Sequence, residues 1–226
     1  MSILIKNIKN QYIFYDKDSE INIEDPLLSK YFMNNSKANI TSLNSGKWIK
    51  KHYLRKGLMS PLKDLYLNTK VINSRSYLEF SILNYLTKNN FPTIKPIAGW
   101  ITKNNFMYTA DLISEYIPSI TLKEYIIKSK IMSKDWYSIG LLISRMHKLN
   151  VFHGDLNITN ILVGKKREFY IIDFDKSIIK SSISSSHRNL NFKRLLRSIE
   201  KNNLKSYLDT KMLYKGYLDG YQLNHG

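Results

Sequence analysis

The sequence predicts a two-lobed α+β protein, in which a β-rich first lobe is followed by a mainly helical second lobe. Residues 1–45 are polar and mixed, as expected of short strands and loops. Most of the second half has the apolar spacing of helices and is interrupted by one β-hairpin pattern. With 226 residues, 43% of them hydrophobic, the chain can bury a substantial core. We assign residues 1–117 to the first lobe and residues 118–226 to the second.

The elements expected in the first lobe follow from periodicity. Residues 47–53 alternate loosely, as a strand does. A helical face over residues 73–88 ends at Asn89 and Asn90, before a proline. Residues 94–102 and 106–117 read as two strands joined by a turn.

The second lobe is expected to begin with a short helix at residues 119–129. A longer helix, with Ser133 as its N-cap, follows as far as residue 149. Two short strands at residues 160–163 and 168–174 flank a polar turn, and residues 186–223 are helical and basic.

The formal net charge of +17 is the strongest feature of the composition. Such a charge attracts polyanions, which include nucleic acid, an anionic membrane surface and a phosphorylated substrate. The same excess of lysine also follows from the Asn-, Ile-, Lys- and Tyr-rich composition of an A+T-rich genome, so both explanations stay open. The chain has no cysteine, which excludes disulfides and thiolate metal sites. We expect no secretory signal and no membrane span, and we place the protein in the cytoplasm.

One ordered set of polar residues points to phosphoryl transfer. This chemistry needs an oriented hydroxyl nucleophile and metal ions that neutralise phosphate oxygens. Asp155 and Asn160 have the D-x-x-x-x-N spacing of a kinase catalytic loop, and Asp173 with Phe174 follows at the position of the metal-binding motif. We therefore predict a protein-kinase-like fold that uses ATP and Mg²⁺. Asp155 is the expected catalytic base, and Asn160 and Asp173 are the expected metal ligands.

Two positions depart from the usual kinase motifs. Asp175 replaces the glycine of Asp-Phe-Gly, and Gly154 replaces the arginine of His-Arg-Asp. A single loop aspartate is more often a turn former or a helix cap, so the argument rests on the whole set. We expect His153 to be structural, with its imidazole bonded to the backbone near Asp173.

The first lobe should supply a lysine for the phosphates and a glutamate that holds it. Lys50 and Lys51 lie on the expected strand, and alternation alone does not decide between them. Glu79 lies in the helix over residues 73–88. The backbone of residues 115–117, starting at Glu115, is expected to bind adenine. The Gly-rich phosphate loop is the poorest match, since only Gly46 stands near it.

From about residue 46 to residue 200, the sequence resembles the 3-deoxy-D-manno-octulosonic acid (Kdo) kinases of lipopolysaccharide synthesis. The segments that carry this resemblance are 51–58, 75–80, 91–97, 153–162, 172–176 and 189–199. The Asp-Phe-Asp motif and the last, basic helix are the most specific. In this comparison Lys51 takes the ATP-lysine position, where relatives often have arginine, and Lys56 replaces a glycine before Gly57.

The resemblance implies phosphorylation of a Kdo hydroxyl, expected to be the 4-OH, on Kdo-lipid A. It also implies peripheral association with the cytoplasmic face of the inner membrane, and no nucleic-acid partner. Residues 165–205 contain eleven Lys or Arg against four Asp or Glu, which suits an anionic glycolipid. The apolar residues 58–62 either dip into the membrane interface or pack under the first lobe.

Two other functions are compatible with parts of the sequence. An atypical RIO-like or tRNA-modification-type kinase or ATPase has a similar loop, but Asp175 and residues 75–80 argue against it. A non-catalytic pseudokinase that binds nucleic acid through its basic helices is the second alternative. The retention of Asp155, Asn160 and Asp173 argues against this, and no recognised nucleic-acid motif is visible.

Overall fold

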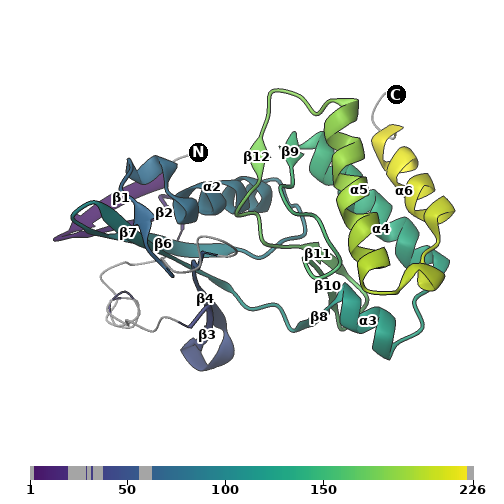
Figure 1. Cartoon of the computed structure of the whole chain (residues 1–226), viewed down its shortest axis with the longest axis horizontal. Helices are drawn as coiled ribbons and strands as arrows, with labels where there is room; N and C mark the ends of the chain where they lie inside the picture. Colours follow the sequence, from purple (N-terminus) through teal and green to yellow (C-terminus); the bar gives the residue numbers. More distant parts are fainter. Residues whose placement is uncertain (1–2, 20–28, 30–31, 33–37, 56–62, 223–226) are drawn as a thin grey trace. The chain divides into compact units, whose positions relative to one another are not determined.

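The computed structural model divides the chain into two units. The first comprises Met1–Tyr85 and Lys95–Tyr116, and the second comprises Leu86–Ile94 and Ile117–Gly226. Strands predominate in the first unit and helices in the second, so the predicted α+β class is confirmed (Figure 1). The structure describes residues 3–19, 29, 32, 38–55 and 63–222.

An antiparallel sheet builds the first unit. Its strand order is β1-β2-β6-β7-β4-β3, and β5 pairs with β7. The strands are β1 (Ile3–Ile8), β2 (Gln11–Asp16), β3 (Ile40–Leu43), β4 (Trp48–His52), β5 (Tyr66–Leu67), β6 (Pro96–Asn104) and β7 (Met107–Glu115). The 3-10 turns η1 (Asn44–Gly46) and η3 (Val71–Asn73) precede β4 and helix α2 (Arg75–Lys88), respectively.

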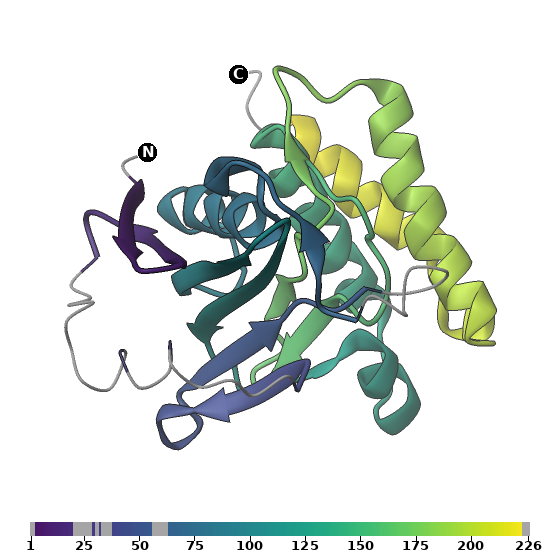
Figure 2. The same ribbon diagram turned by 60° about the vertical axis from the view of Figure 1, so that its left-hand side comes forward.

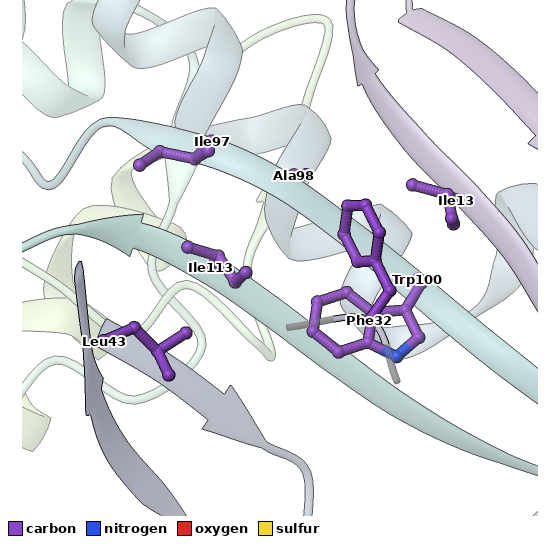
Figure 3. Close-up of a cluster of buried hydrophobic side chains, with 7 residues drawn as sticks. All are labelled: Ile13, Phe32, Leu43, Ile97, Ala98, Trp100 and Ile113. Carbon is purple, nitrogen blue, oxygen red and sulfur yellow. The ribbon is translucent and has the colours of Figure 1, made fainter. Parts of the chain in front are cut away.

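The core of the first unit gathers on the central strands of this sheet. Trp100 and Phe32 meet edge to face, with ring centroids 5.1 Å apart (Figure 3). The buried cluster consists of Ile13, Phe32, Leu43, Ile97, Ala98, Trp100 and Ile113. These side chains come from β2, β3, β6 and β7 and a residue between β2 and β3, so the core joins both halves of the sheet.

The helix and the hairpin expected in the first lobe are present. Helix α2 ends where the sequence predicted, and Asn90 turns the chain with a φ of +53°. Asparagine adopts this left-handed conformation more readily than most residues, so it can end a helix. Strands β6 and β7 are joined at Asn105, whose φ is +50°, so the turn lies slightly later than expected.

The second unit contains four helices and two small sheets among its described residues (Figures 1 and 2). The three-stranded sheet has the order β11-β10-β8, and β12 pairs with β9. The strands are β8 (Ser119–Thr121), β9 (Val151–Phe152), β10 (Ile161–Gly164), β11 (Phe169–Ile171) and β12 (Ile178–Ile179). The helices are α3 (Leu122–Lys128), α4 (Ser133–Lys148), α5 (Ser185–Lys201) and α6 (Thr210–Gln222), and the 3-10 turn η4 (Lys205–Tyr207) precedes α6.

Helices α4 and α6 pack closely because glycines remove side chains from their interface. A Cβ atom on Gly140 would lie 2.1 Å from the carbonyl oxygen of Leu213. A Cβ atom on Gly216 would lie 2.0 Å from the carbonyl oxygen of Tyr137. These backbone approaches leave no room for alanine at either position.

Two local expectations for the second lobe were wrong. Ser119–Thr121 forms a strand rather than the start of a helix, because it pairs with Leu162–Gly164 of β10. The helix begins after Thr121, whose side chain caps it together with Glu124. Ser133 lies inside α4 and does not cap it. The N-cap position is Met132, whose backbone N–H donates to the Asp135 carboxylate at 2.8 Å.

Some of the sequence predictions concern residues outside the described ranges. These are Lys56, Gly57 and the apolar residues 58–62. In the part of the chain that the structure describes, no helix has both the length and the apolar character that a membrane crossing requires.

Candidate active site

The loop between β9 and β10 carries the predicted catalytic base. Leu156 and Ile158 are buried and anchor the loop, whereas Asp155 is exposed. Apolar residues at alternate positions therefore fix the backbone while the carboxylate of Asp155 stays accessible to a substrate.

Two asparagines shape this loop through one acceptor. The side chains of Asn157 and Asn160 both donate to the carbonyl oxygen of Asp155, at 3.0 and 2.9 Å. The Asn157 oxygen in turn accepts from the backbone and side chain of Thr159, at 2.8 and 2.6 Å. Asn157 was not singled out from the sequence. Its position two residues after an aspartate, in an Asx-turn sequence, is the signal that would have found it.

His153 connects the loop to the predicted metal-binding motif. Its Nδ1 accepts the backbone N–H of Asp155 at 3.0 Å. Its Nε2 therefore carries the proton and donates to the carbonyl oxygen of Ile172 at 3.1 Å. This bond confirms the prediction that His153 is bonded to the backbone near Asp173. Complete burial lowers the pKa of His153 to about 4, so the ring is neutral at neutral pH.

Asp173 follows β11 in a strained conformation. Its φ is +63°, in the left-handed region that few residues other than glycine, asparagine and aspartate adopt. Both backbone groups of Ile172, the residue before it, are bonded. Its N–H donates to the carbonyl oxygen of Asn160 at 2.9 Å, and its carbonyl oxygen accepts from His153 Nε2 at 3.1 Å. The residue after Asp173, Phe174, is buried against the His153 ring, with centroids 4.7 Å apart. Strain that is held by its surroundings in this way is typical of functional sites.

Gly154 explains the departure from His-Arg-Asp. A Cβ atom at this position would lie 2.0 Å from the carbonyl oxygen of Lys176. The N–H of Gly154 also donates to Ser177 Oγ at 3.2 Å. The loop and the segment after the metal motif therefore touch backbone to backbone, and only glycine allows this approach.

The donor set fits Mg²⁺. The nitrogen of the Asn160 side chain is committed to the Asp155 carbonyl, which leaves the amide oxygen as the atom that can bind a cation. Amide and carboxylate oxygens are the protein ligands that Mg²⁺ prefers, and Asp173 supplies a carboxylate directly after Ile172, whose N–H bonds the Asn160 carbonyl. Asn160 and Asp173 are thus the residues that would hold the ion.

In the first unit, Lys50 and Lys51 are adjacent on β4, so their side chains point to opposite faces of the strand and have different surroundings. Lys51 Nζ lies 2.7 Å from Glu79 Oε2, and the same oxygen accepts from the Tyr53 hydroxyl. Glu79 is 1% exposed, so it is not an ordinary surface charge. Lys51 keeps 23% of its side chain exposed, which leaves part of its ammonium accessible to a phosphate.

Lys50 is buried in a cluster of charges on the other side of β4. Its Nζ lies 3.5 Å from Asp111 Oδ1 and 5.7 Å from the centroid of the Trp100 ring. The same carboxylate bonds His52 Nδ1 at 2.8 Å, and His52 Nε2 faces Asp64 at 3.2 Å. Lys50 is 1% exposed, so this environment favours a structural role.

The residues predicted to bind adenine are partly committed to other bonds. The N–H of Glu115 donates to the Lys95 carbonyl and that of Tyr116 donates to the Lys47 carbonyl, both at 2.9 Å. The Glu115 side chain is half exposed and lies 3.4 Å from Lys95 Nζ. Gly46 lies in the turn between β3 and β4, with a φ of +85°.

Known proteins resemble this chain over most of its length. The family described as "Lipopolysaccharide kinase (Kdo/WaaP) family" matches residues 33–217. Among the relatives are proteins called 3-deoxy-D-manno-octulosonic acid kinase. The one from Vibrio cholerae serotype O1 is 40% identical over 153 residues, which cover 67% of this chain and 64% of the relative, just under two thirds. The relative from Pasteurella multocida is 36% identical over 179 residues, covering 76% and 74%. The relative from Vibrio parahaemolyticus serotype O3:K6 is 34% identical over 220 residues, covering 89% and 90%.

Proposed function

The chain belongs to the lipopolysaccharide kinase (Kdo/WaaP) family, whose fold is protein-kinase-like, and we propose that it transfers a phosphoryl group from ATP to a Kdo hydroxyl. The acceptor is Kdo-lipid A and the expected position is the 4-OH. The observation that carries this proposal is the single hydrogen-bonded assembly of Asp155, Asn160 and the segment before Asp173. The family match favours a sugar kinase over the RIO-like and pseudokinase alternatives.

Each residue has a separate task in the proposed reaction. Asp155 orients the acceptor hydroxyl and takes its proton as the oxygen attacks phosphorus. Asn160 and Asp173 hold Mg²⁺, which when bound neutralises the charge that develops on the phosphate oxygens. The Glu79 carboxylate holds Lys51 in place for the α- and β-phosphates of ATP, and this favours Lys51 over Lys50 as the phosphate-binding lysine.

The acceptor is anionic, and the second unit carries basic side chains that could bind it. On α5, Lys193, Arg197 and Lys201 are exposed, and none of the three bonds a carboxylate among the described residues. We propose that these side chains bring the protein to the cytoplasmic face of the inner membrane as a peripheral enzyme. Each basic side chain near an anionic surface contributes about 1 kcal/mol of binding free energy.

Phosphate transfer to a purified acceptor tests the proposal. Radiolabelled ATP and Mg²⁺ are supplied with Kdo-lipid A, and with lipid A that lacks Kdo as the control. Label is expected only on the Kdo-bearing lipid. Asp155→Asn should abolish transfer and leave ATP affinity within about threefold of wild type, because the carboxylate acts on the acceptor and not on the nucleotide. Asp18→Asn, a change at an exposed carboxylate in the first unit, is the matched control. ATP binding without label on either lipid would contradict the proposed acceptor.

A further inference from the structure

A row of buried, hydrogen-bonded polar side chains in the second unit lies outside the residues assigned to the proposed reaction. Tyr217 of α6, His147 of α4 and Asn191 of α5 are 6%, 1% and 0% exposed. Burying three polar side chains among apolar helices costs free energy unless every group is bonded.

In this row of side chains, each residue from Tyr217 onward donates a hydrogen bond to the next. Asn191 Nδ2 donates to the carbonyl oxygen of His153 at 2.6 Å, so its Oδ1 is the acceptor. His147 Nε2 lies 3.0 Å from that oxygen and therefore carries the proton. His147 Nδ1 is left as an acceptor, and the Tyr217 hydroxyl, 3.0 Å away, donates to it. Burial lowers the pKa of His147 to about 4, which keeps the ring neutral.

The last hydrogen bonds of this row are made to the backbone of the catalytic loop. Asn191 bonds the His153 carbonyl and also lies 3.4 Å from the His153 N–H, so one amide spans both sides of this residue. The His153 ring in turn holds the N–H of Asp155 and the carbonyl of Ile172. A displacement of the His153 backbone would therefore move the predicted base and the residue before the metal-binding Asp173 together.

Helix α5 supports the same loop at two more points. Arg194 donates to the His153 carbonyl at 3.2 Å, and Ser198 Oγ accepts the N–H of Ile158 at 3.1 Å. Positions 191, 194 and 198 are three and four residues apart, so they lie on one face of α5. Among them, Asn191 alone is completely buried and is oriented by a second helix.

We propose that Asn191 is a positioning residue for Asp155, and that His147 and Tyr217 fix the orientation of its amide. If the Asn191 amide rotated by 180°, its oxygen would face the His153 carbonyl oxygen, and its NH₂ group would face the N–H of His153 and the Nε2–H of His147. Such an unsatisfied arrangement is costly away from water, so only one orientation is stable. The inference that this affects catalysis rests on the proposed kinase function, but the effect on the loop does not.

The first experiment compares Asn191→Ala with Asn189→Ala, a change at an exposed asparagine on the same helix. In Asn191→Ala, kcat should fall about 10- to 100-fold while the KM for ATP changes less than about threefold, because misplaced catalytic groups slow the chemical step. Amide hydrogen exchange should accelerate over residues 153–158, with α4 and α6 still protected. A kcat within about threefold of wild type would overturn the proposal, as would exchange that rises equally in α4 and α6.

The second experiment uses His147 as a matched pair of variants. His147→Gln keeps an N–H near the position of Nε2 and should retain slow exchange over residues 153–158. His147→Leu removes the donor and should accelerate it, even if Asn191→Ala does not fold. Equal exchange in both variants would overturn the role of His147. Exchange needs no substrate, so a wild-type protein inactive toward Kdo-lipid A would disprove the proposed function without affecting this test.

Discussion

The side-chain nitrogen of Asn160 donates to the backbone carbonyl oxygen of Asp155 at 2.9 Å. The bond closes the loop between the predicted base and the predicted metal ligand, and it leaves the amide oxygen of Asn160 as the side-chain atom that can bind a cation. Asn157 donates to the same carbonyl at 3.0 Å but is not expected to bind metal. Variants of these two asparagines can therefore test loop shape and the predicted metal binding separately.

Asn160→Ala should raise the Mg²⁺ concentration needed for half-maximal transfer by about 10- to 100-fold, since an oxygen ligand is lost. Asn157→Ala should lower kcat and leave the Mg²⁺ dependence as in wild type, because only a loop bond is lost. The measurement is the transfer rate against Mg²⁺ concentration for both variants. The same Mg²⁺ dependence in both would contradict the assignment of Asn160 as a ligand.

Lys51→Met and Lys50→Met should fail in different ways. Lys51→Met should reduce kcat/KM for ATP on the order of 100-fold, because a charge on the phosphates is lost. Its Tm should fall less than that of Lys50→Met, because Lys51 keeps 23% of its side chain exposed and the Tyr53 hydroxyl still donates to Glu79. Lys50→Met should lower the free energy of unfolding by about 3 kcal/mol, since it removes a buried partner of Asp111. Thermal unfolding and nucleotide titration distinguish the two outcomes. A large loss of ATP affinity in Lys50→Met alone would reverse the assignment.

The choice between these lysines shows where the sequence stops being informative. The strand at residues 47–53 is predictable, and β4 covers most of it. Alternation shows that neighbouring side chains point to opposite faces of the strand, but it does not show which face meets the glutamate. The decision depends on Glu79, which lies 28 residues away on α2. Contacts at that separation leave no local periodic signal. By contrast, the spacing of Asp155 and Asn160 is local, and the sequence therefore identifies it.

Asn191 is a residue that the sequence analysis missed. It belongs to the predicted basic helix, but its partner His153 is 38 residues away in the chain. A weak signal exists, because Asn191 lies on the same face of α5 as the buried Leu195. A polar residue within the apolar face of an amphipathic helix indicates a buried hydrogen bond, although not the identity of its partner.

Gly154→Ala should impair both folding and transfer. The added Cβ meets the Lys176 carbonyl, and a backbone group can move only with its segment, so we expect a loss of about 2 kcal/mol in the free energy of unfolding. Gly164→Ala is the control, since its added Cβ meets the end of the flexible Glu168 side chain at 2.8 Å. Denaturant unfolding measures both variants. Equal stability of the two would argue against the close approach at Gly154.

Membrane association should depend on salt and on α5. Replacing Lys193, Arg197 and Lys201 by glutamine should weaken binding to anionic vesicles about 100-fold at low salt, at roughly 1 kcal/mol for each charge. Replacing Lys128, Lys130 and Lys134 by glutamine removes the same number of exposed charges from α3, α4 and the loop between them, and should have a smaller effect. Vesicle sedimentation at low and high salt gives the comparison. Wild-type binding that does not weaken with salt would rule out an electrostatic contact.

Stability should fall as the pH drops from 6.5 towards 4, in part because of two buried histidines. Burial lowers the pKa of His147 and of His153 from 6.5 to about 4. Between these values the unfolded chain binds protons that the folded chain excludes, so each ring contributes stability that is complete above pH 6.5 and is lost on acidification. The slope is up to about 1.4 kcal/mol per pH unit for each histidine.

His52 should act in the opposite direction. Although burial opposes its charge, the carboxylates of Asp111 and Asp64 raise its pKa above 6.5. The stability that His52 contributes is therefore complete below pH 6.5 and is lost as the pH rises through its raised pKa. Among the three rings, the loss of stability below pH 6.5, which is the acid limb of the stability curve, is then due to His147 and His153. Urea unfolding from pH 4 to 9 should show His147→Gln with a shallower acid limb than wild type. His52→Gln should instead show a shallower alkaline limb, with the acid limb unchanged. An acid limb that is as steep in His147→Gln as in wild type would mean that His147 is not held neutral by its burial between Tyr217 and Asn191.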